Sequence, residues 1–358
     1  MPYSILPYVL RKALLAAALI AAAALIALVF WHEGPHAQKI TIAHSTIAGP
    51  AWPLYAARDG GYYARYGLDV NLTYAVHPGE IAMVVSGQAA MAYCGLEQAM
   101  QASSRDGSLV VYASPFKKGL LALMANSRYQ SVRDLKGKRI GVGQFGDTPH
   151  TYAIGLLVRF GLTPRDVEWV IAGAGGSERA TALQSGRVDA TFVSAPAYFR
   201  LEDRGYRNLG NIIDYDDLHA PFVFLFKKAY VTAHPRLAEL LIKADAEAIK
   251  RLYEDTQFAV QSYLHYNRED PADIERILDL YRNLNTFQRT PYILRPAVQY
   301  MLDHPVDERT GATMRNFDFT TVLDNSIVDK LVREGFFEQL FGLQVKTEQE
   351  HKQKIAFQ

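Results

Sequence analysis

Four short segments of this sequence combine hydroxyl-bearing or glycine residues with the expected start of a helix. The segments are Ser45-Thr46 before Gly49-Pro50, Cys94-Gly95 before Glu97, Gly146-Asp147-Thr148 before Pro149, and Ser194-Ala195 before Pro196. Free backbone N–H groups and the positive end of the helix dipole make helix N-termini good sites for anionic or polar groups. The alternative is plain helix capping, which Ser, Thr and Asp commonly perform. The chemistry indicated is non-covalent ligand binding, with capping as the open alternative.

Three ionisable side chains accompany these segments. The carboxylates of Glu97 and Asp147 are suited to pair with a cationic or ring N–H group of a ligand, although Asp147 is also placed to cap its helix. His150 stands in the first turn of the following helix, where a ligand contact and an exposed surface position fit the sequence equally well. Cys94, the one cysteine, is typical of a small core residue and allows neither a disulfide nor a cysteine metal site within the chain.

Other chemistry finds little support. Gly141, Gly143 and Gly146 imitate a dinucleotide fingerprint, but the acidic residue required at the end of the next strand is missing, because that strand ends in Ile171-Ala172. No Walker-type "GxxxxGK[ST]", "GxSxG" or "HExxH" motif occurs, and the ten histidines lack metal-ligand spacing. We therefore expect no catalytic residue, no metal and no cofactor.

The elements that must position these segments alternate between strands and helices. Short apolar runs at 40–45, 70–74, 90–94, 109–113, 139–142, 167–171 and 188–194 predict strands, and helix-like segments lie between most of them. A helix expected from about Pro149 to Phe160 stops at Gly161, a C-cap signal. Such alternation predicts βαβ units and a mostly parallel sheet, which is an α/β fold.

Two βα blocks followed by a helical return predict two lobes with a ligand cleft between them. We assign residues 38–125 to the first part of lobe 1, 126–220 to lobe 2, and 221–345 to the return to lobe 1 and its C-terminal helices, so the chain crosses near Ala125 and near Pro221. The segment 346–358 is polar, and we expect it to be poorly ordered. Ligands of open α/β sheets bind outside the carboxyl ends of the strands, where the four segments lie.

Composition excludes several classes of partner. The chain has 358 residues, of which 49% are hydrophobic and 21% charged, and its 38 basic and 37 acidic side chains give a net charge of +1. The hydrophobic content is that of a globular protein. The charge balance argues against a nucleic-acid partner, which normally leaves a basic excess. We expect a monomer.

The N-terminus has the parts of an export segment. Arg11 and Lys12 precede an apolar run from Ala13 to Phe30, after which the chain turns polar. This run of 18 residues is at the border between a cleaved signal and a membrane-spanning anchor, and both remain open for residues 1–37. The segment predicts a periplasmic or other extracytoplasmic location, with anchoring to the inner membrane by residues 13–30 as one form of it.

Residues 39 to about 255 resemble the substrate-binding proteins of nitrate/sulfonate/taurine ABC transporters. The resemblance rests on four segments: "AGPAWPLYAARDGGYYARYGLDV", "VVSGQAAMAYCG", "DLKGKRIGV" and "ALQSGRVDATFVSAP". The sequence departs from the family at Ala90, where an acidic residue is usual, and in the "GLEQ" that follows.

The resemblance implies a type II periplasmic-binding-protein fold, whose lobes close on a ligand like a hinge. It implies a small-molecule solute as ligand and an ABC permease as partner. Carried over by position, it places ligand contacts at Ser45, Thr46, Trp52, Gly95, Asp147, Thr148 and Ser194, to which the ionisable side chains add Glu97 and His150.

Two other functions compete with solute capture. An enzyme of the thiamine-pyrimidine synthase type shares the scaffold but uses a cysteine-rich segment, which a chain with only Cys94 does not supply. The sensor lobe of a transcription regulator also shares the fold, but such a regulator begins with a basic helix-turn-helix, whereas this chain begins with an export-like segment. We expect a non-enzymatic solute-binding protein.

Overall fold

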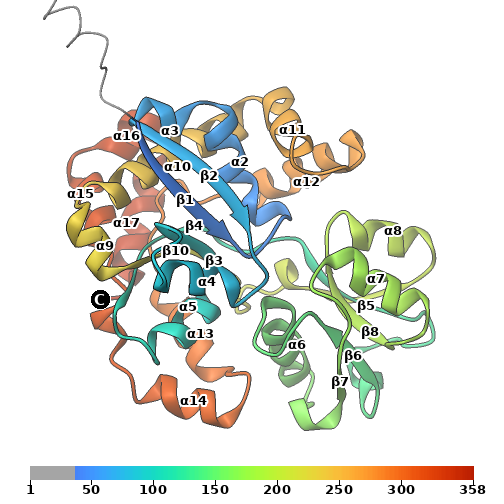
Figure 1. The fold of residues 1–358 in the computed structure, drawn as a ribbon. Coiled ribbons are helices and arrows are strands. Elements are labelled where there is room, and N and C mark those ends of the chain that lie inside the picture. Colours follow the sequence, from blue (N-terminus) through green and yellow to red (C-terminus); the bar gives the residue numbers. More distant parts are fainter. Residues whose placement is uncertain (1–36) are drawn as a thin grey trace, which may run out of the picture.

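The computed structural model describes residues 37–358, which form two lobes, each built around a five-stranded sheet (Figure 1). The sheet of lobe 1 has the order β2-β1-β3-β10-β4, with strands β1 (Gln38–His44), β2 (Leu68–Tyr74), β3 (Met91–Gly95), β4 (Leu109–Phe116) and β10 (Phe222–Lys227). The sheet of lobe 2 has the order β7-β6-β8-β5-β9, with strands β5 (Leu121–Ala125), β6 (Arg139–Val142), β7 (Glu168–Ile171), β8 (Ala190–Ser194) and β9 (Arg207–Asn211).

The two sheets have the same construction. In each, three strands run parallel, β2, β1 and β3 in lobe 1 and β7, β6 and β8 in lobe 2. The fourth strand of each sheet arrives from the other lobe and pairs antiparallel, β10 with β3 and β5 with β8. The parallel strands therefore end at one edge of each sheet, and the predicted α/β fold of two lobes is confirmed.

Helices cover both sheets. Lobe 2 carries α6 (Thr148–Arg159), α7 (Gly176–Gln184) and α8 (Ala197–Asp203). Lobe 1 carries α2 (Trp52–Asp59), α3 (Tyr62–Arg65), α4 (Gly79–Val85), α5 (Leu96–Ser103), α9 (Lys228–Ala233), α10 (Leu237–Glu254), α11 (Thr256–Leu264), α12 (Pro271–Asn283), α13 (Arg295–Asp303), α14 (Glu308–Arg315), α15 (Ser326–Arg333), α16 (Phe336–Phe341) and α17 (Val345–Ile355). As predicted, α6 stops just before Gly161, whose positive φ of 80° suits glycine at a helix end.

The first crossing between lobes comes earlier than the sequence predicted. Strand β5 ends at Ala125 but belongs to the second sheet, so the chain leaves lobe 1 between Phe116 and Leu121. The apolar run of β5 resembles the lobe 1 strands before it, which is why periodicity alone misplaced the boundary. Lys118 lies in this crossing, and its ammonium donates to the carbonyls of Tyr215 and Leu218 at 2.6 and 3.3 Å. Lys118 thereby ties the two crossing segments together.

The prediction of a poorly ordered tail at 346–358 was wrong. Helix α17 docks against lobe 1, and beyond it the N–H of Phe357 donates to the carbonyl of Ile293 at 2.9 Å. The inner face of α17 is partly polar, since Lys352 is buried and its ammonium forms an ion pair with Glu348 at 2.6 Å. Because the buried face of the helix contains paired polar residues, hydropathy gave no sign of it.

The expected export signal or anchor at 1–37 lies almost entirely outside the described residues. Within residues 37–358, none of the helices combines the length and the apolar character that crossing a membrane requires.

Candidate ligand-binding cleft

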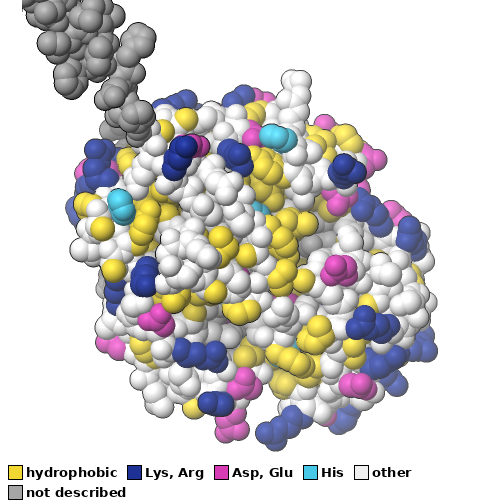
Figure 2. All heavy atoms as spheres, viewed as in Figure 1, with side chains coloured by type: hydrophobic (Ala, Val, Ile, Leu, Met, Phe, Trp, Pro, Cys, Tyr) yellow, Lys and Arg dark blue, Asp and Glu magenta, His cyan; other side chains and the backbone are white. Residues whose placement is uncertain are grey.

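A cleft lies between the lobes, bordered by loops from both sheets. It encloses about 1260 Å³ when its open mouth is counted. Figure 2 shows apolar side chains gathered along the boundary between the lobes. Three of the four predicted segments contribute to its lining: Ser45 and Thr46 after β1, Asp147 and Thr148 at α6, and Ser194 to Ala197 at α8. From the fourth segment none of Cys94, Gly95 and Glu97 lines the cleft, although the neighbouring Gln98 of α5 does. The predicted convergence on one gap is thus found for three of the four segments, and contact of each residue with a ligand stays a prediction.

Local hydrogen bonds hold the lobe 1 loops in place. The Thr46 hydroxyl accepts from the N–H of Ala48 at 3.1 Å. The side-chain oxygen of Gln98 accepts from the N–H of Gly95 at 2.9 Å and from the Ser45 hydroxyl at 3.4 Å. The hydroxyls therefore serve the loop geometry as well as the cleft, so capping and lining are not exclusive at these positions.

In lobe 2, Asp147 caps α6 and also faces the cleft. Its two oxygens accept from the N–H groups of His150 and Gln144 at 2.9 and 2.8 Å. Burial raises the pKa of Asp147, and the nearby Arg179 guanidinium opposes that rise. The capping alternative is thus correct for Asp147, which lines the cleft at the same time.

Four of the nine predicted site residues do not line the cleft. Trp52 is fully buried, and its indole N–H donates to the carbonyl of Ala259 at 2.8 Å, so it belongs to the core of lobe 1. Gly95 ends β3 directly beneath the carboxyl group of Glu97, which occupies the space that a Cβ would need. Both residues lie near helix starts as expected, but the Trp52 side chain points into the core of lobe 1 and Gly95 is covered by Glu97.

The other two, Glu97 and His150, are also buried away from the cleft. Glu97 accepts from the Thr148 hydroxyl at 2.6 Å, a bond between the lobes. Burial raises the pKa of Glu97 to about 7, and the Thr148 hydrogen bond opposes that rise. Burial lowers the pKa of His150 to about 4, which keeps the ring neutral, and its Nδ1 accepts from the N–H of Gly146 at 2.9 Å.

Sequence reasoning missed a fifth junction that lines the cleft. Gly175, Gly176 and Ser177 at the start of α7 and Arg179 in its first turns all face it. The signal was present in the glycines that follow β7, but the arginine resembled an exposed helical residue. Arg179 is only 4% exposed.

The C-terminal helices also contribute to the cleft. Tyr263, Asn267, Glu269 and Tyr281 of α11, α12 and their connection line it. Arg200 of α8 in lobe 2 forms ion pairs with Glu269 and, at 3.4 Å, with Asp273. The region beyond residue 256 thus supplies one side of the cleft and a polar contact between the lobes.

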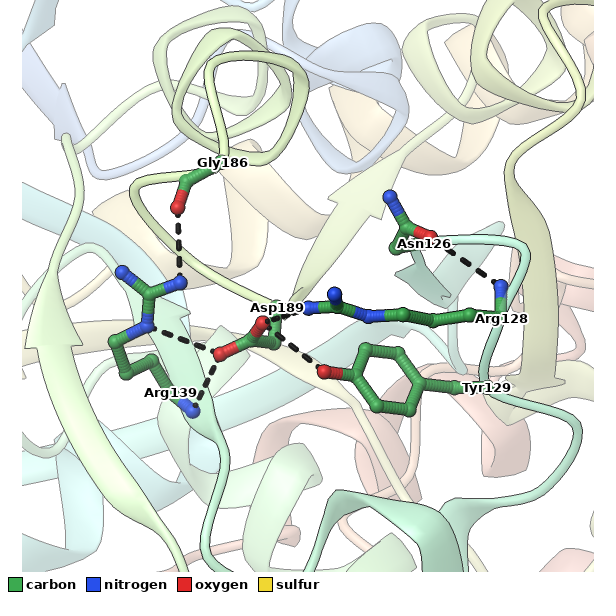
Figure 3. A network of polar contacts seen from close by, with 6 residues as sticks. All are labelled: Asn126, Arg128, Tyr129, Arg139, Gly186 and Asp189. Carbon is green, nitrogen blue, oxygen red and sulfur yellow. Dashed lines mark hydrogen bonds and ion pairs between the residues drawn. The ribbon is translucent and has the colours of Figure 1, made fainter.

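A second polar cluster surrounds Asp189 in lobe 2 (Figure 3). Asp189 precedes β8, at the end of that strand away from the cleft, and accepts from Arg128, Tyr129 and Arg139 at 2.8, 3.1 and 3.0 Å. Asp189 belongs to the "GRVDA" segment of the family resemblance. Its partners tie β5, β6 and β8 together, so its role is to stabilise the lobe.

Comparison with known proteins agrees with this architecture. A family model described as NMT1/THI5 like matches residues 51–259, more than half of the chain. The 4-amino-5-hydroxymethyl-2-methylpyrimidine phosphate synthase of Schizosaccharomyces pombe is 25% identical over 258 residues, which cover 66% of this chain and 72% of that protein.

Two solved structures show the same fold. A periplasmic sulfonate-binding protein of an ABC transporter from Methylobacillus flagellatus superposes with a TM-score of 0.66 at 19% identity, covering 86% of this chain and 96% of that one. The periplasmic nitrate-binding protein of Synechocystis PCC 6803 also gives a TM-score of 0.66, at 14% identity, covering 88% and 92%. The described residues therefore have the periplasmic-binding-protein fold.

Proposed function

This chain belongs to the NMT1/THI5-like family, and from that premise we propose that it is a solute-binding protein which captures a small organic or anionic molecule for an ABC importer. The export-like N-terminus supports an extracytoplasmic location, and a permease in the membrane is the partner that would receive the solute. We propose that the chain acts as a monomer without cofactor or turnover.

One observation carries the proposal. Five strand-to-helix junctions, three from lobe 2 and two from lobe 1, border a single cleft between lobes joined by two crossing segments. Helix beginnings supply uncommitted N–H groups, which suit the polar groups of a small molecule. The lining also contains apolar surface from Ile47, Val76 and Pro50, as small-molecule sites usually do.

A second candidate function is synthesis of a pyrimidine phosphate, favoured by the similarity to the Schizosaccharomyces pombe synthase. Enzymes of the thiamine-pyrimidine synthase type, which share this scaffold, use a cysteine-rich segment. Here Cys94 is fully buried in β3 and does not line the cleft. We therefore place solute capture first.

Thermal unfolding with a panel of solutes tests the proposal. We expect at least one sulfonate, nitrate salt, pyrimidine or aromatic acid to raise the melting temperature, because a ligand at 100 times its Kd stabilises the folded state by about 2.7 kcal/mol. Ser194→Trp, which fills the cleft, removes this shift. Ser185→Trp at the far, exposed end of α7 is the matched control and keeps it.

Mass spectrometry of the bound compound separates the two functions. Recovery of unchanged solute after long incubation supports capture, whereas a new pyrimidine product supports the enzyme. No shift with any member of the panel contradicts solute capture.

A further inference from the structure

Glu97 is an ionisable group enclosed between the two lobes. It belongs to α5 in lobe 1, is only 2% exposed, and its carboxylate lies directly over Gly95 at the end of β3. From lobe 2, the hydroxyl of Thr148 at the start of α6 donates to Oε1 at 2.6 Å. A residue of the other lobe therefore covers this carboxylate, and its access to water depends on how the lobes are arranged.

Three buried polar atoms at this interface have no hydrogen-bond partner among residues 37–358. They are Oε2 of Glu97 and the hydroxyl oxygens of Tyr152 in α6 and Tyr300 in α13. The Tyr300 hydroxyl reaches Gly155 of α6 in the other lobe. Burial raises the pKa of both tyrosine hydroxyls, and the Glu97 carboxylate adds to the rise. An ionised carboxylate needs donors at both oxygens, and only one is satisfied here, so the neutral acid fits this interface better.

The other ionisable groups around Glu97 do not form a fixed positive partner for it. His77, in the loop between β2 and α4, opposes the rise in the pKa of Glu97, but its ring is paired with Glu80 at 2.9 Å. Asp147, the cap of α6, adds to the rise. Cys94 lies behind in β3, and burial raises the pKa of its thiol, which keeps it neutral. Burial therefore decides which form of Glu97 is present.

Protonation of Glu97 is linked to the position of the lobes. Burial raises the pKa of Glu97 from its ordinary 4.5 to about 7, and the Thr148 hydrogen bond opposes that rise. When the lobes separate, α6 takes Thr148 and Tyr152 away and water reaches the carboxyl, so its pKa falls towards the ordinary value. The closed form then binds the proton more tightly than the open form. This contribution to closure is complete below the pKa of the open form and is lost as the pH rises from about 4.5 through about 7.

We propose that Glu97 is a proton-binding site between the lobes, and that the cleft closes more readily when Glu97 is protonated than when it is ionised. Because a solute held from both lobes needs the closed form, its affinity rises as the medium becomes more acidic. The inference goes beyond the proposed function, since it needs lobes that close but does not depend on which solute enters the cleft.

Energy transfer between single pairs of dyes, one on each lobe, measures the ratio of closed to open molecules without any solute. Gln257→Cys in α11 of lobe 1 and Gln184→Cys in α7 of lobe 2 place the dyes at exposed, uncharged positions, while the buried Cys94 stays unlabelled. We expect the ratio to fall by about tenfold or more between pH 4.5 and pH 8, because each unit of pKa difference between the two forms changes it tenfold. A ratio that is constant over this range overturns the proposal.

Glu97→Gln separates the effect of Glu97 from that of its neighbours. Glutamine stays neutral and its side-chain oxygen still accepts from Thr148, so we expect this variant to keep at pH 8 most of the closed population that it has at pH 4.5. The control is Glu350→Gln on the exposed side of α17, which retains the pH dependence of the wild type. An unchanged dependence in Glu97→Gln contradicts the proposal, because another group such as His77 or Asp147 then causes it.

Thr148→Val and Thr148→Ser test the contact between the lobes. Valine has nearly the shape of threonine but donates no hydrogen bond, and the loss of this bond raises the pKa of Glu97 further in the closed form. The fall in the closed population therefore continues to a higher pH in Thr148→Val, whereas Thr148→Ser, which keeps the hydroxyl, behaves as the wild type. If Glu97→Gln fails to fold, this pair decides, and equal curves for valine and serine contradict the proposal.

The outcomes separate this inference from the proposed function. If a solute of the panel stabilises the protein but pH does not change the lobe populations, the proton site is wrong and solute capture stands. If the lobes respond to pH as expected but no solute binds, the proton site stands and solute capture fails.

Discussion

Asp189 holds the edge of lobe 2 that faces away from the cleft. Its carboxylate accepts from the Arg139 side chain and backbone N–H and from Tyr129 and Arg128. Burial by itself would raise the pKa of Asp189, but these hydrogen bonds outweigh it and lower the pKa to about 2. A carboxyl with a lowered pKa stabilises the folded state above its ordinary pKa, and that contribution is lost as the pH falls towards the folded value.

Asp189→Asn should therefore lower the free energy of unfolding at pH 7 by about 1–2 kcal/mol, a value reduced for partial screening by solvent. The difference from the wild type should shrink as the pH falls from about 4 to about 2. Urea unfolding at several pH values measures it. The exposed Asp203→Asn is the control; an equal loss in both variants would show that Asp189 has no special role.

Glu97 shows how a site prediction can identify an important residue and assign it the wrong role. The sequence placed it at a helix start and suggested a ligand contact, but its carboxylate instead receives the Thr148 hydroxyl from the other lobe. Helical spacing fixes where a residue lies along the helix, and only the tertiary structure decides whether its side chain faces a ligand or another lobe. Arg179 escaped prediction for the complementary reason, since arginine is rarely buried unless backbone carbonyls or acids surround it.

At the scale of elements, α8 and α12 form a contact between the lobes beside the cleft. Arg200 pairs with Glu269 and Asp273, and the Arg276 guanidinium lies 3.9 Å from the ring centre of Phe199. Glu269 also lines the cleft. These contacts join the two lobes, so we expect them to favour the closed form that the family resemblance implies.

Arg200→Ala should weaken solute binding by about two- to fivefold, because partly exposed ion pairs contribute up to about 1 kcal/mol. Titration calorimetry at low and high salt measures the effect, and the difference between wild type and variant should diminish at high salt. Arg251→Ala removes an ion pair with Asp255 that lies within lobe 1 and is the matched control. Equal affinities for the wild type and Arg200→Ala at low salt would show that this contact does not favour closure.

Elements with a strong periodic pattern were predicted well, and those stabilised by polar contacts were not. Strand β6 and helix α6 match the expected ranges closely, since β-branched runs and a glycine stop mark them. Helix α17 was missed because its inner face contains Lys352, whose ammonium is buried against the carbonyl of Thr290, a residue 62 positions away in the sequence. Local sequence does not encode such a pairing.

At the scale of the molecule, the two lobes have sheets with the same strand order, and each sheet includes one strand that arrives from the other lobe. The strand ends of the two sheets face each other across the cleft. The sequence predicted two lobes and a cleft because alternation of strands and helices identifies the fold class. It misplaced the first crossing because β5 is as apolar as the strands that precede it. The strand order that assigns β5 to lobe 2 is a property of the whole chain.

We propose that one solute is held by turns from both lobes at the cleft. Hydrogen–deuterium exchange with and without a saturating solute reports on this, because a bound solute covers the turns that line the cleft and restrains their N–H groups. We expect slower exchange at 45–48 in lobe 1 and at 144–148, 175–177 and 194–197 in lobe 2 when the solute is bound. Protection confined to one lobe, or located away from these four turns, would contradict it.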